Sequence, residues 1–455
     1  MLRKKTPTFL FPIAGFALTI LAGTILLHQR FSLTGEPLGW VDALFTATSA
    51  TCVTGLAVVD TGTAFSTAGQ SVLLALIQLG GLGIMTYTSL IFYLWRNRIS
   101  LTDREAVSQT LLHDPKFSLG HFLKHVVLGC LLIEAFGALA LFLLDPQGFA
   151  PFSALFHAVS AFCNAGFALQ SDSLMHWRGN IGVNAVFMGL IVLGGLGFVV
   201  LLELAEHATG KHIRAGGSSF QPVGRLSWHA RVVLSMSVWL IIGGALAILV
   251  VEFLLHSGQY APGEELLGSL FQSVTCRTAG FNTMDIGTLS NVSLLVMMFL
   301  MFVGGAPGSC AGGVKVTTLR AMTAFCVARL KGRHQAVVGN FALDESTMNG
   351  ALTLMMLATG VIALATLILC VSETGAVPHA ATRGQFLEIL FEVVSAFGTV
   401  GLSTGITPEL STTGKLTLTA LMFVGRLGPI VFLQVLQELY TQEKFRWAEK
   451  RLPIG

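Results

Sequence analysis

Thr399-Val400-Gly401-Leu402 is the last of four related strings that decide the fold of this chain. The other three are Val53-Thr54-Gly55-Leu56, Asn164-Ala165-Gly166-Phe167 and Thr278-Ala279-Gly280-Phe281. Each string follows a short apolar segment, and successive glycines are 111, 114 and 121 residues apart. One special glycine in each period of this length predicts four copies of one unit around a common axis.

The chain is far more apolar than a soluble protein. Of its 455 residues, 53% are hydrophobic and 11% are charged, against roughly 25% charged residues in soluble domains. Eight stretches are long enough to cross a bilayer, which takes about 20 residues. They lie near 9–28, 71–95, 122–144, 182–206, 231–254, 290–326, 348–371 and 416–438. Four shorter apolar segments, 41–52, 152–162, 267–276 and 387–397, are too short to cross, so we expect re-entrant pore helices there.

These segments predict an all-α integral membrane protein made of four helix–pore loop–helix repeats, with eight transmembrane helices and four pore helices around one pseudo-fourfold pore. The expected repeats are 9–95, 122–206, 231–326 and 348–438, followed by a C-terminal tail, 439–455. Of the 27 lysines and arginines, 20 lie at the termini or in the loops after the second, fourth and sixth stretches. The positive-inside rule therefore predicts cytoplasmic termini and outward-facing pore loops.

Backbone carbonyls suit a dehydrated cation because they supply several oxygens without a trapping charge. Glycine lets successive carbonyls point the same way, because it adopts φ values that a Cβ disfavours. The C-terminal ends of four pore helices add partial negative charge near the axis. The predicted selectivity filter, which binds the ion through its carbonyls, consists of Val53, Thr54, Gly55, Asn164, Ala165, Gly166, Thr278, Ala279, Gly280, Thr399, Val400 and Gly401. We call the four segments around these residues the filter loops.

The loops are not identical. The third is one residue shorter between its phenylalanine, Phe271, and Gly280, and it carries Arg277. We expect Arg277 to face away from the axis and to bridge carboxylates or pore-helix carbonyls. For Asp42 and Glu388 two interpretations stay open: they concentrate cations at the outer face, or they are favourable charges at helix starts.

A second glycine-rich string recurs 24 to 28 residues after each filter glycine, at Gly80, Gly194, Gly304 and Gly425. Close packing of membrane helices explains the first two copies. The third cannot continue a helix, because it holds five glycines and a proline. It predicts an intramembrane loop over 304–315. Two interpretations of this loop stay open: it acts as a gate, or it is only an irregularity of helix packing. Its residues are Gly304, Gly305, Ala306, Pro307, Gly308, Ser309, Cys310, Ala311, Gly312, Gly313, Val314 and Lys315.

The fourth copy has Arg426 in place of a glycine. A charge at membrane depth usually faces a cavity or a partner. Arg426 is therefore predicted to belong to the gate. It either forms an electrostatic barrier or holds the loop in place by binding the carbonyls of the loop. The alternative is a structural pairing with Glu134, Glu203 or Glu252.

Seven cysteines lie in apolar segments without a CxxC pattern, which argues against a disulfide framework. Cys52, Cys163 and Cys276 precede filter glycines. A metal-binding ring of these three is the minor alternative to small buried side chains behind the filter.

Together, the four filter loops, the string GGAPGSCAGGVK from Gly304 to Lys315 and the arginine in FVGRLGP from Phe423 to Pro429 resemble the Trk/Ktr/HKT superfamily of potassium transporters. The first and third filter strings look most similar to the membrane component of bacterial Ktr systems, the KtrB type. Gly55 stands where the sodium-favouring HKT branch often has serine, and Cys52 and Cys276 stand where relatives often have threonine.

The resemblance implies potassium uptake across the bacterial cytoplasmic membrane, often stimulated by sodium and without an organic cofactor. It also implies a homodimer that binds a cytoplasmic ring of nucleotide-binding regulatory subunits of the KtrA type. The chain itself has no nucleotide fingerprint such as GxGxxG, and no nucleic-acid partner is expected.

Three other functions compete with this one. A Trk- or HKT-like cation or sodium transporter differs in the ion it prefers. An intramembrane enzyme would need convergent catalytic side chains, and the sequence has no HExxH or GxSxG motif, so we expect no enzyme. A structural scaffold would leave four matched glycine loops unexplained.

Overall fold

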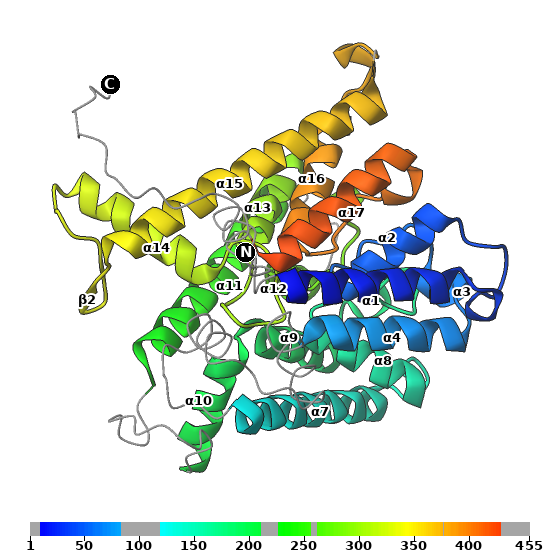
Figure 1. Cartoon of the computed structure of the whole chain (residues 1–455), viewed down its shortest axis with the longest axis horizontal. Helices are drawn as coiled ribbons and strands as arrows, with labels where there is room; N and C mark the ends of the chain where they lie inside the picture. The colour runs from blue at the N-terminus through cyan, green and yellow to red at the C-terminus, as the bar shows by residue number, and fades with distance from the viewer. Residues whose placement is uncertain (1–9, 83–118, 211–225, 256–261, 376, 429–455) are drawn as a thin grey trace, which may run out of the picture.

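The computed structural model describes residues 10–82, 119–210, 226–255, 262–375 and 377–428, which form helices joined by short turns (Figure 1). The first two groups of helices are α1 (Leu10–His28), α2 (Trp40–Thr51), α3 (Thr61–Ala64) and α4 (Thr67–Gly81), then α7 (Leu119–Leu144), α8 (Pro151–Phe162), α9 (Ile181–Gly195) and α10 (Phe198–Thr209). The last two groups are α11 (Trp228–Leu255), α12 (Pro262–Thr275), α13 (Asn291–Phe302) and α14 (Val316–Leu330), then α15 (Glu345–Leu369), α16 (Gln385–Gly398) and α17 (Thr412–Leu427). A two-stranded antiparallel hairpin, β1 (Val337–Val338) and β2 (Phe341–Ala342), joins α14 to α15.

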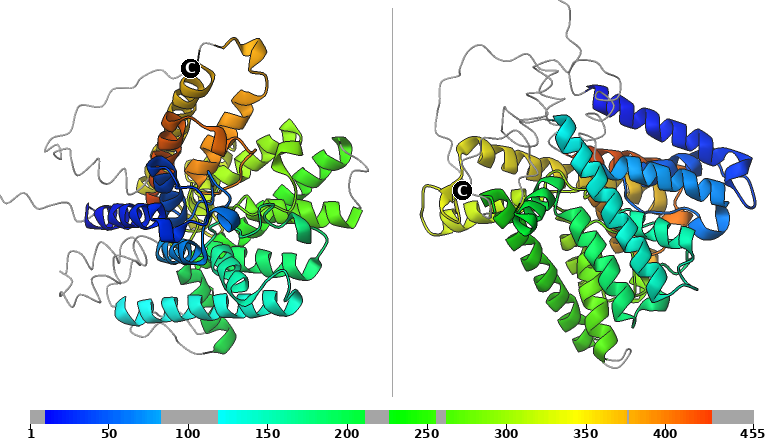
Figure 2. Two further views of the ribbon diagram at one scale, coloured as in Figure 1. Left: turned by 90° about the vertical axis from the view of Figure 1, so that its right-hand side faces the viewer. Right: turned by 90° about the horizontal axis from the view of Figure 1, so that it is seen from below.

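Each group repeats one pattern: a long helix, a short helix, a loop and a further helix. The further helix packs against the short helix of the next group, so that α4 contacts α8, α9 contacts α12, α13 contacts α16, and α17 contacts α2. These contacts close a ring. Figure 2 (left) shows the same arrangement, with the colours following one another around a common centre.

Polar N-caps start the further helix of every group. The side chains of Ser66, Asn180, Ser290 and Ser411 each accept a hydrogen bond from a backbone N–H in the first turn. Such caps stabilise a helix by about 1 kcal/mol because they satisfy an N–H that has no partner within the helix. The four caps therefore place the four further helices at equivalent points of the repeat.

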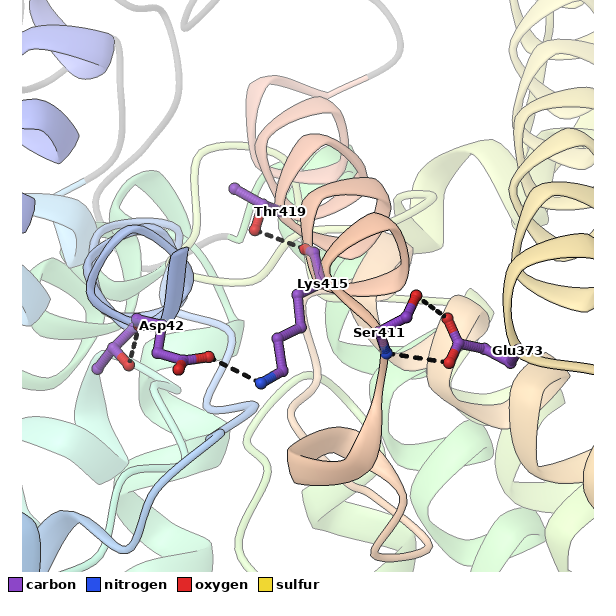
Figure 3. Close-up of polar contacts among 6 residues, drawn as sticks. Asp42, Glu373, Ser411, Lys415 and Thr419 are labelled. Carbon is purple, nitrogen blue, oxygen red and sulfur yellow. Dashed lines mark hydrogen bonds and ion pairs between the residues drawn. The ribbon is translucent and has the colours of Figure 1, made fainter. Parts of the chain in front are cut away.

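An ion pair spans the seam between the last and first groups, and hydrogen bonds join α15 to α17 within the last group (Figure 3). Lys415 of α17 forms an ion pair with Asp42 in the first turn of α2, at 2.8 Å. Glu373, in a π-helical turn that extends α15, accepts hydrogen bonds from the backbone N–H and the hydroxyl of Ser411, at 3.0 and 2.7 Å. Asp42 thus serves as a helix-start charge with a partner, and Glu388 lies in the first turn of α16.

Apolar side chains are distributed differently on the short and the long helices. Each short helix buries a phenylalanine completely, namely Phe45, Phe156, Phe271 and Phe391. The long helices instead expose large apolar groups, such as Phe136 at 73%, Trp239 at 75% and Met356 at 76%. Large apolar surfaces of this kind mark a contact with lipid or protein rather than with water.

Three described helices are long and apolar enough to cross a membrane alone, over 124–144, 228–254 and 345–374. The sequence predicts a continuous helix over 182–206, and this prediction is wrong. The helix ends at Gly195, and α10 leaves at an angle of 109°. Gly197 adopts a φ of 87° at the bend, a value that glycine tolerates. The ends of two other predicted helices, and the tail 439–455, lie outside the described residues.

Candidate functional site

The filter loops share one unusual backbone conformation. Gly55, Gly166, Gly280 and Gly401 all have positive φ, at 96°, 71°, 81° and 92°. The residue two positions earlier is also left-handed in every loop, with φ values of 56° for Val53, 59° for Asn164, 75° for Thr278 and 51° for Thr399. Non-glycine residues seldom adopt this region, and a β-branched valine or threonine does so at a cost. Four matched exceptions show that all four loops are held in the same strained form.

The four glycines also face one another. A Cβ added at Gly55 would lie 2.5 Å from the carbonyl oxygen of Ala165, and one at Gly166 would lie 2.8 Å from that of Ala279. A Cβ added at Gly280 would lie 2.4 Å from the carbonyl oxygen of Val400, and one added at Gly401 would lie 2.0 Å from that of Thr54. Each loop thus approaches the next, and the fourth approaches the first. The predicted filter residues therefore form one closed ring.

A hydroxyl side chain supports each loop from behind. Ser49 and Ser395 accept hydrogen bonds from the N–H groups of Gly55 and Gly401, both at 3.1 Å. Ser160 and Thr275 donate instead to the carbonyls that follow the other two filter glycines, Phe167 and Phe281, at 2.8 and 2.7 Å. Sequence reasoning missed these four residues. Their signal was a serine or threonine six residues before the glycine, or five in the shortened third loop.

The segment between α13 and α14 has no helix and lies directly against two filter loops. A Cβ added at Gly312 would lie 2.2 Å from the hydroxyl of Thr399, and one at Gly304 would lie 3.4 Å from the Thr278 methyl group. The ends of the segment are tied together, because Gly304 donates to the Val314 carbonyl at 2.9 Å. The residues that the sequence assigned to a gate are therefore next to the filter.

The bend between α9 and α10 and this segment hold each other. The N–H groups of Ala306 and Cys310 donate to the carbonyls of Gly195 and Gly194, at 2.9 and 3.1 Å. The N–H of Phe198 donates back to the Gly308 carbonyl at 3.1 Å. Carbonyls at the end of α9 would lack partners without these bonds, which explains why the helix can stop at this depth.

Two cationic side chains bind the same segment. Lys315 donates to the carbonyls of Ala311 and Gly312, at 2.6 and 3.3 Å. Arg426 is buried and donates to the carbonyls of Cys310 and Gly80. Both side chains thus contact backbone carbonyls, which agrees with the interpretation of Arg426 as a holder of the loop.

The glutamates considered as partners of Arg426 have other contacts. Glu134 accepts from the Gln78 amide at 3.1 Å, and Glu203 accepts from the Ser227 N–H at 3.1 Å. Glu252 accepts from Ser290, the N-cap of α13. The alternative of a structural pairing with these residues gains no support from this geometry.

Arg277 points away from the ring, as expected. Its guanidinium lies against α11, where it contacts the Ser237 carbonyl at 3.4 Å and hydroxyl at 3.2 Å. The sequence predicts that Arg277 binds carboxylates or pore-helix carbonyls, and instead it binds Ser237 of the long helix α11. The Asn164 side chain also faces outward, toward the carbonyls of Ile191 and Ala161.

Close packing accounts for the glycines of the further helices. A Cβ at Gly80 would lie 2.0 Å from the Thr51 carbonyl, and those at Gly194 and Gly425 would lie 1.8 and 2.1 Å from the carbonyls of Phe162 and Phe397.

The cysteines offer no metal site, because no three His, Cys, Asp or Glu side chains in the described part of the chain converge on one point. The ring of Cys52, Cys163 and Cys276 is therefore not formed.

Two aspartates lie just outside the ring, five residues after their filter glycines. Asp60 accepts hydrogen bonds from the N–H groups of Gly62 and Thr63, both at 2.9 Å. Partial burial raises the pKa of Asp60, but hydrogen bonds from Ser171, Thr63 and Gly62 outweigh it and leave the pKa below its usual range. This carboxylate therefore stays ionised at neutral pH close to the first filter loop.

Comparison with known proteins agrees with this architecture. The family model of the cation transport protein TrkH matches residues 15–444. The chain is 38% identical to the Ktr system potassium uptake protein B of Bacillus subtilis, over 92% of this chain and 90% of that protein. It is 34% identical to the potassium/sodium uptake protein NtpJ of Enterococcus hirae, over 100% of this chain and 98% of that protein.

A solved structure shares the fold. The crystal structure of the potassium transporter TrkH from Vibrio parahaemolyticus superimposes with a TM-score of 0.70 at 19% identity, covering 96% of this chain and 86% of that one. At this identity the match concerns the fold alone. The sequence relatives are uptake proteins, in line with the expectation of a transporter and not an enzyme.

Proposed function

The chain belongs to the TrkH family of cation transport proteins, and on that premise we propose that it takes up potassium ions through the ring of filter loops. The observation that carries the proposal is the matched pair of left-handed residues in each loop, closed into a ring of four. Alternating left-handed residues turn successive carbonyls toward one side, which is what a partly dehydrated cation requires. The carbonyls of the twelve predicted filter residues, from Val53 to Gly401, coordinate the ion.

Four repeats carry the ring in a bacterial cytoplasmic membrane, over 9–95, 122–206, 231–326 and 348–438. Their longer segments cross the bilayer, with the fourth bent after Gly195. The four short helices enter the bilayer from outside, and both termini lie in the cytoplasm. The exposed apolar faces of the long helices and the distribution of lysine and arginine support this topology.

The segment Gly304–Lys315 closes the cytoplasmic side of the filter and acts as the gate, together with Arg426. Its contacts with Thr278 and Thr399 support this role, since any ion that leaves the ring must pass these residues. Lys315 and Arg426 keep the segment in place through its own carbonyls.

Sodium assists uptake, and a cytoplasmic nucleotide-binding protein of the KtrA type regulates a homodimer of this chain. The support comes from the relatives, one of which is named as part of a Ktr system and another as a potassium/sodium uptake protein. The name of the second relative also favours an alternative, a cation transporter that carries both ions.

Ion-competition uptake in proteoliposomes tests the proposal. Potassium influx driven by a membrane potential is expected, with potassium preferred over sodium, and a regulatory partner should alter the rate. Equal sodium and potassium influx would favour the alternative. Purified, well-folded protein that carries neither ion would refute the proposed function.

A further inference from the structure

The outer side of the ring has a lower symmetry than the filter itself. In the first and third loops, the residue five positions after the filter glycine is an aspartate. Its side chain accepts a hydrogen bond from the backbone N–H of a second glycine, two positions after the aspartate. Asp60 binds Gly62 at 2.9 Å, and Asp285 binds Gly287 at 3.0 Å. The second and fourth loops have Ser171 and Ile406 at the position of these aspartates. They need another support.

That support comes from the pore helices. His157 and Glu392 each follow the fully buried phenylalanine of their helix, and both are completely buried. Each accepts a hydrogen bond from the backbone N–H three residues past its filter glycine. Leu169 donates to Nε2 of His157 at 3.2 Å, and Thr404 donates to Oε1 of Glu392 at 3.3 Å.

The chemistry of each group fits the role of acceptor. Nδ1 of His157 lies 2.7 Å from the Ser153 carbonyl, to which it can only donate. The proton is therefore on Nδ1, and Nε2 carries the lone pair that accepts the hydrogen bond from the Leu169 N–H. Glu392 needs no such choice of tautomer, because a carboxylate only accepts. It also receives hydrogen bonds from the hydroxyls of Ser403 and Thr407, at 2.5 and 2.9 Å.

The two segments held in this way press against their neighbours. A Cβ at Gly62 of the first loop would lie 2.0 Å from the Leu169 carbonyl, and one at Gly287 of the third would lie 3.3 Å from the Thr404 carbonyl. The ring order places the second and fourth loops opposite each other. His157 and Glu392 therefore support the entrance from two opposite sides, and the aspartate-capped loops rest on the segments that they hold.

We propose that His157 and Glu392 are positioning residues that set ion discrimination by holding the outer ends of the second and fourth filter loops. The proposal rests on the potassium transport proposed above. Only two residues separate each bound N–H from the filter glycine, so the direction of the glycine carbonyl depends on this hydrogen bond. A loop that loses the bond fits potassium less closely and discriminates less against sodium.

The corresponding residues of the other two repeats provide a matched control. Gln272 occupies the same helix position and is equally buried, but its amide has no hydrogen-bond partner among the described residues. Thr46 donates to the Asp42 carbonyl of its own helix. Neither residue holds the outer end of a filter loop.

The test compares Glu392→Gln, Glu392→Met, His157→Phe and Gln272→Met in the full chain, reconstituted in vesicles. Potassium uptake is measured against increasing sodium. Glutamine keeps an acceptor for Thr404, whereas methionine and phenylalanine remove the acceptor at similar volume. Glu392→Met and His157→Phe should each lower the potassium/sodium preference on the order of tenfold. Glu392→Gln and Gln272→Met should stay within about twofold of the parent.

Three results would overturn the proposal: unchanged preference in His157→Phe and Glu392→Met, an equal loss in Glu392→Gln, or an equal loss in Gln272→Met. The second would assign the effect to charge, and the third to packing. If Glu392→Met does not fold, His157→Phe decides, because it tests the opposite loop. Failure of the parent chain to carry potassium would refute the proposed function and, because this assignment rests on it, the assignment as well. A parent that carries potassium, with unchanged preference in both variants, would refute the assignment alone.

Discussion

Replacing each filter glycine by alanine in turn should damage potassium uptake in a definite order. The added methyl group would meet the carbonyl of the neighbouring loop at 2.0 Å for Gly401, 2.4 Å for Gly280, 2.5 Å for Gly55 and 2.8 Å for Gly166. Ordinary contact begins at 3.4 Å. The neighbour must therefore retreat by about 1.4, 1.0, 0.9 and 0.6 Å respectively. Because that neighbour is the proposed ion ligand, each shift acts directly on the ion.

Backbone strain adds to the steric clash. A residue with a Cβ in the left-handed region costs about 1–2 kcal/mol, and the cost rises away from the narrow allowed range near 50–70°. Gly166 has a φ of 71°, close to that range, whereas Gly401 has 92° and Gly55 has 96°. Each 1.4 kcal/mol corresponds to a factor of about ten. We expect Gly166→Ala to weaken apparent potassium affinity about tenfold, and Gly401→Ala on the order of a hundredfold.

Gly384 offers a control that separates strain from clash. Its φ is 96°, the same as that of Gly55, but a Cβ there would meet no atom within 4 Å. Gly384→Ala should therefore leave affinity near that of the parent. The measurement is the potassium concentration for half-maximal uptake in vesicles, after checking that each variant is folded. Equal losses at Gly166 and Gly401, or a loss at Gly384 as large as at Gly55, would refute the reasoning.

Three further predictions concern the gate and the seam. Deleting 306–310 should raise potassium flux severalfold, because the segment against the filter is shortened; unchanged or lower flux in a folded protein would contradict it. Gly197→Ala should also raise flux with little change in affinity, since its Cβ would lie 2.8 Å from the Pro307 carbonyl at a φ of 87°; kinetics at saturating potassium measure this. A double-mutant cycle of Lys415→Met and Asp42→Asn should give a coupling of about 1 kcal/mol or less in unfolding experiments, because the side chains are 15% and 30% exposed. A larger coupling would mean that the seam is less accessible to solvent than the structure indicates.

The repeat and its short helices were predictable because the evidence for them is local. The four glycines share a period, and the lengths of the apolar segments distinguish short helices from long ones. The interruption after Phe302 was equally plain, since five glycines and a proline within twelve residues cannot form a helix.

Other features depend on contacts between distant segments. The bend at Gly197 follows from hydrogen bonds between the end of α9 and the segment around Cys310, which lies more than a hundred residues away. The glycines at 194, 195 and 197 fit close helix packing, and by themselves they do not distinguish packing from a bend. Likewise, Val53 is left-handed although a valine by itself favours a strand conformation, so its propensity predicts the wrong backbone. The order of the loops around the ring was also beyond any pattern along the chain.

The contacts of Arg426 favour a latch over an electrostatic barrier, and two substitutions can separate these roles. Its guanidinium binds the carbonyl of Cys310 in the third repeat and that of Gly80 in the first, while the residue itself belongs to the fourth. One side chain thus joins three repeats around the proposed gate. Lysine keeps the charge, but its compact ammonium does not reproduce the planar fork that reaches two separate carbonyls. If Arg426 is a latch, Arg426→Lys should raise flux as much as Arg426→Gln does. If it is a barrier, Arg426→Lys should behave like the parent, so measuring both variants under the same membrane potential decides between the two roles.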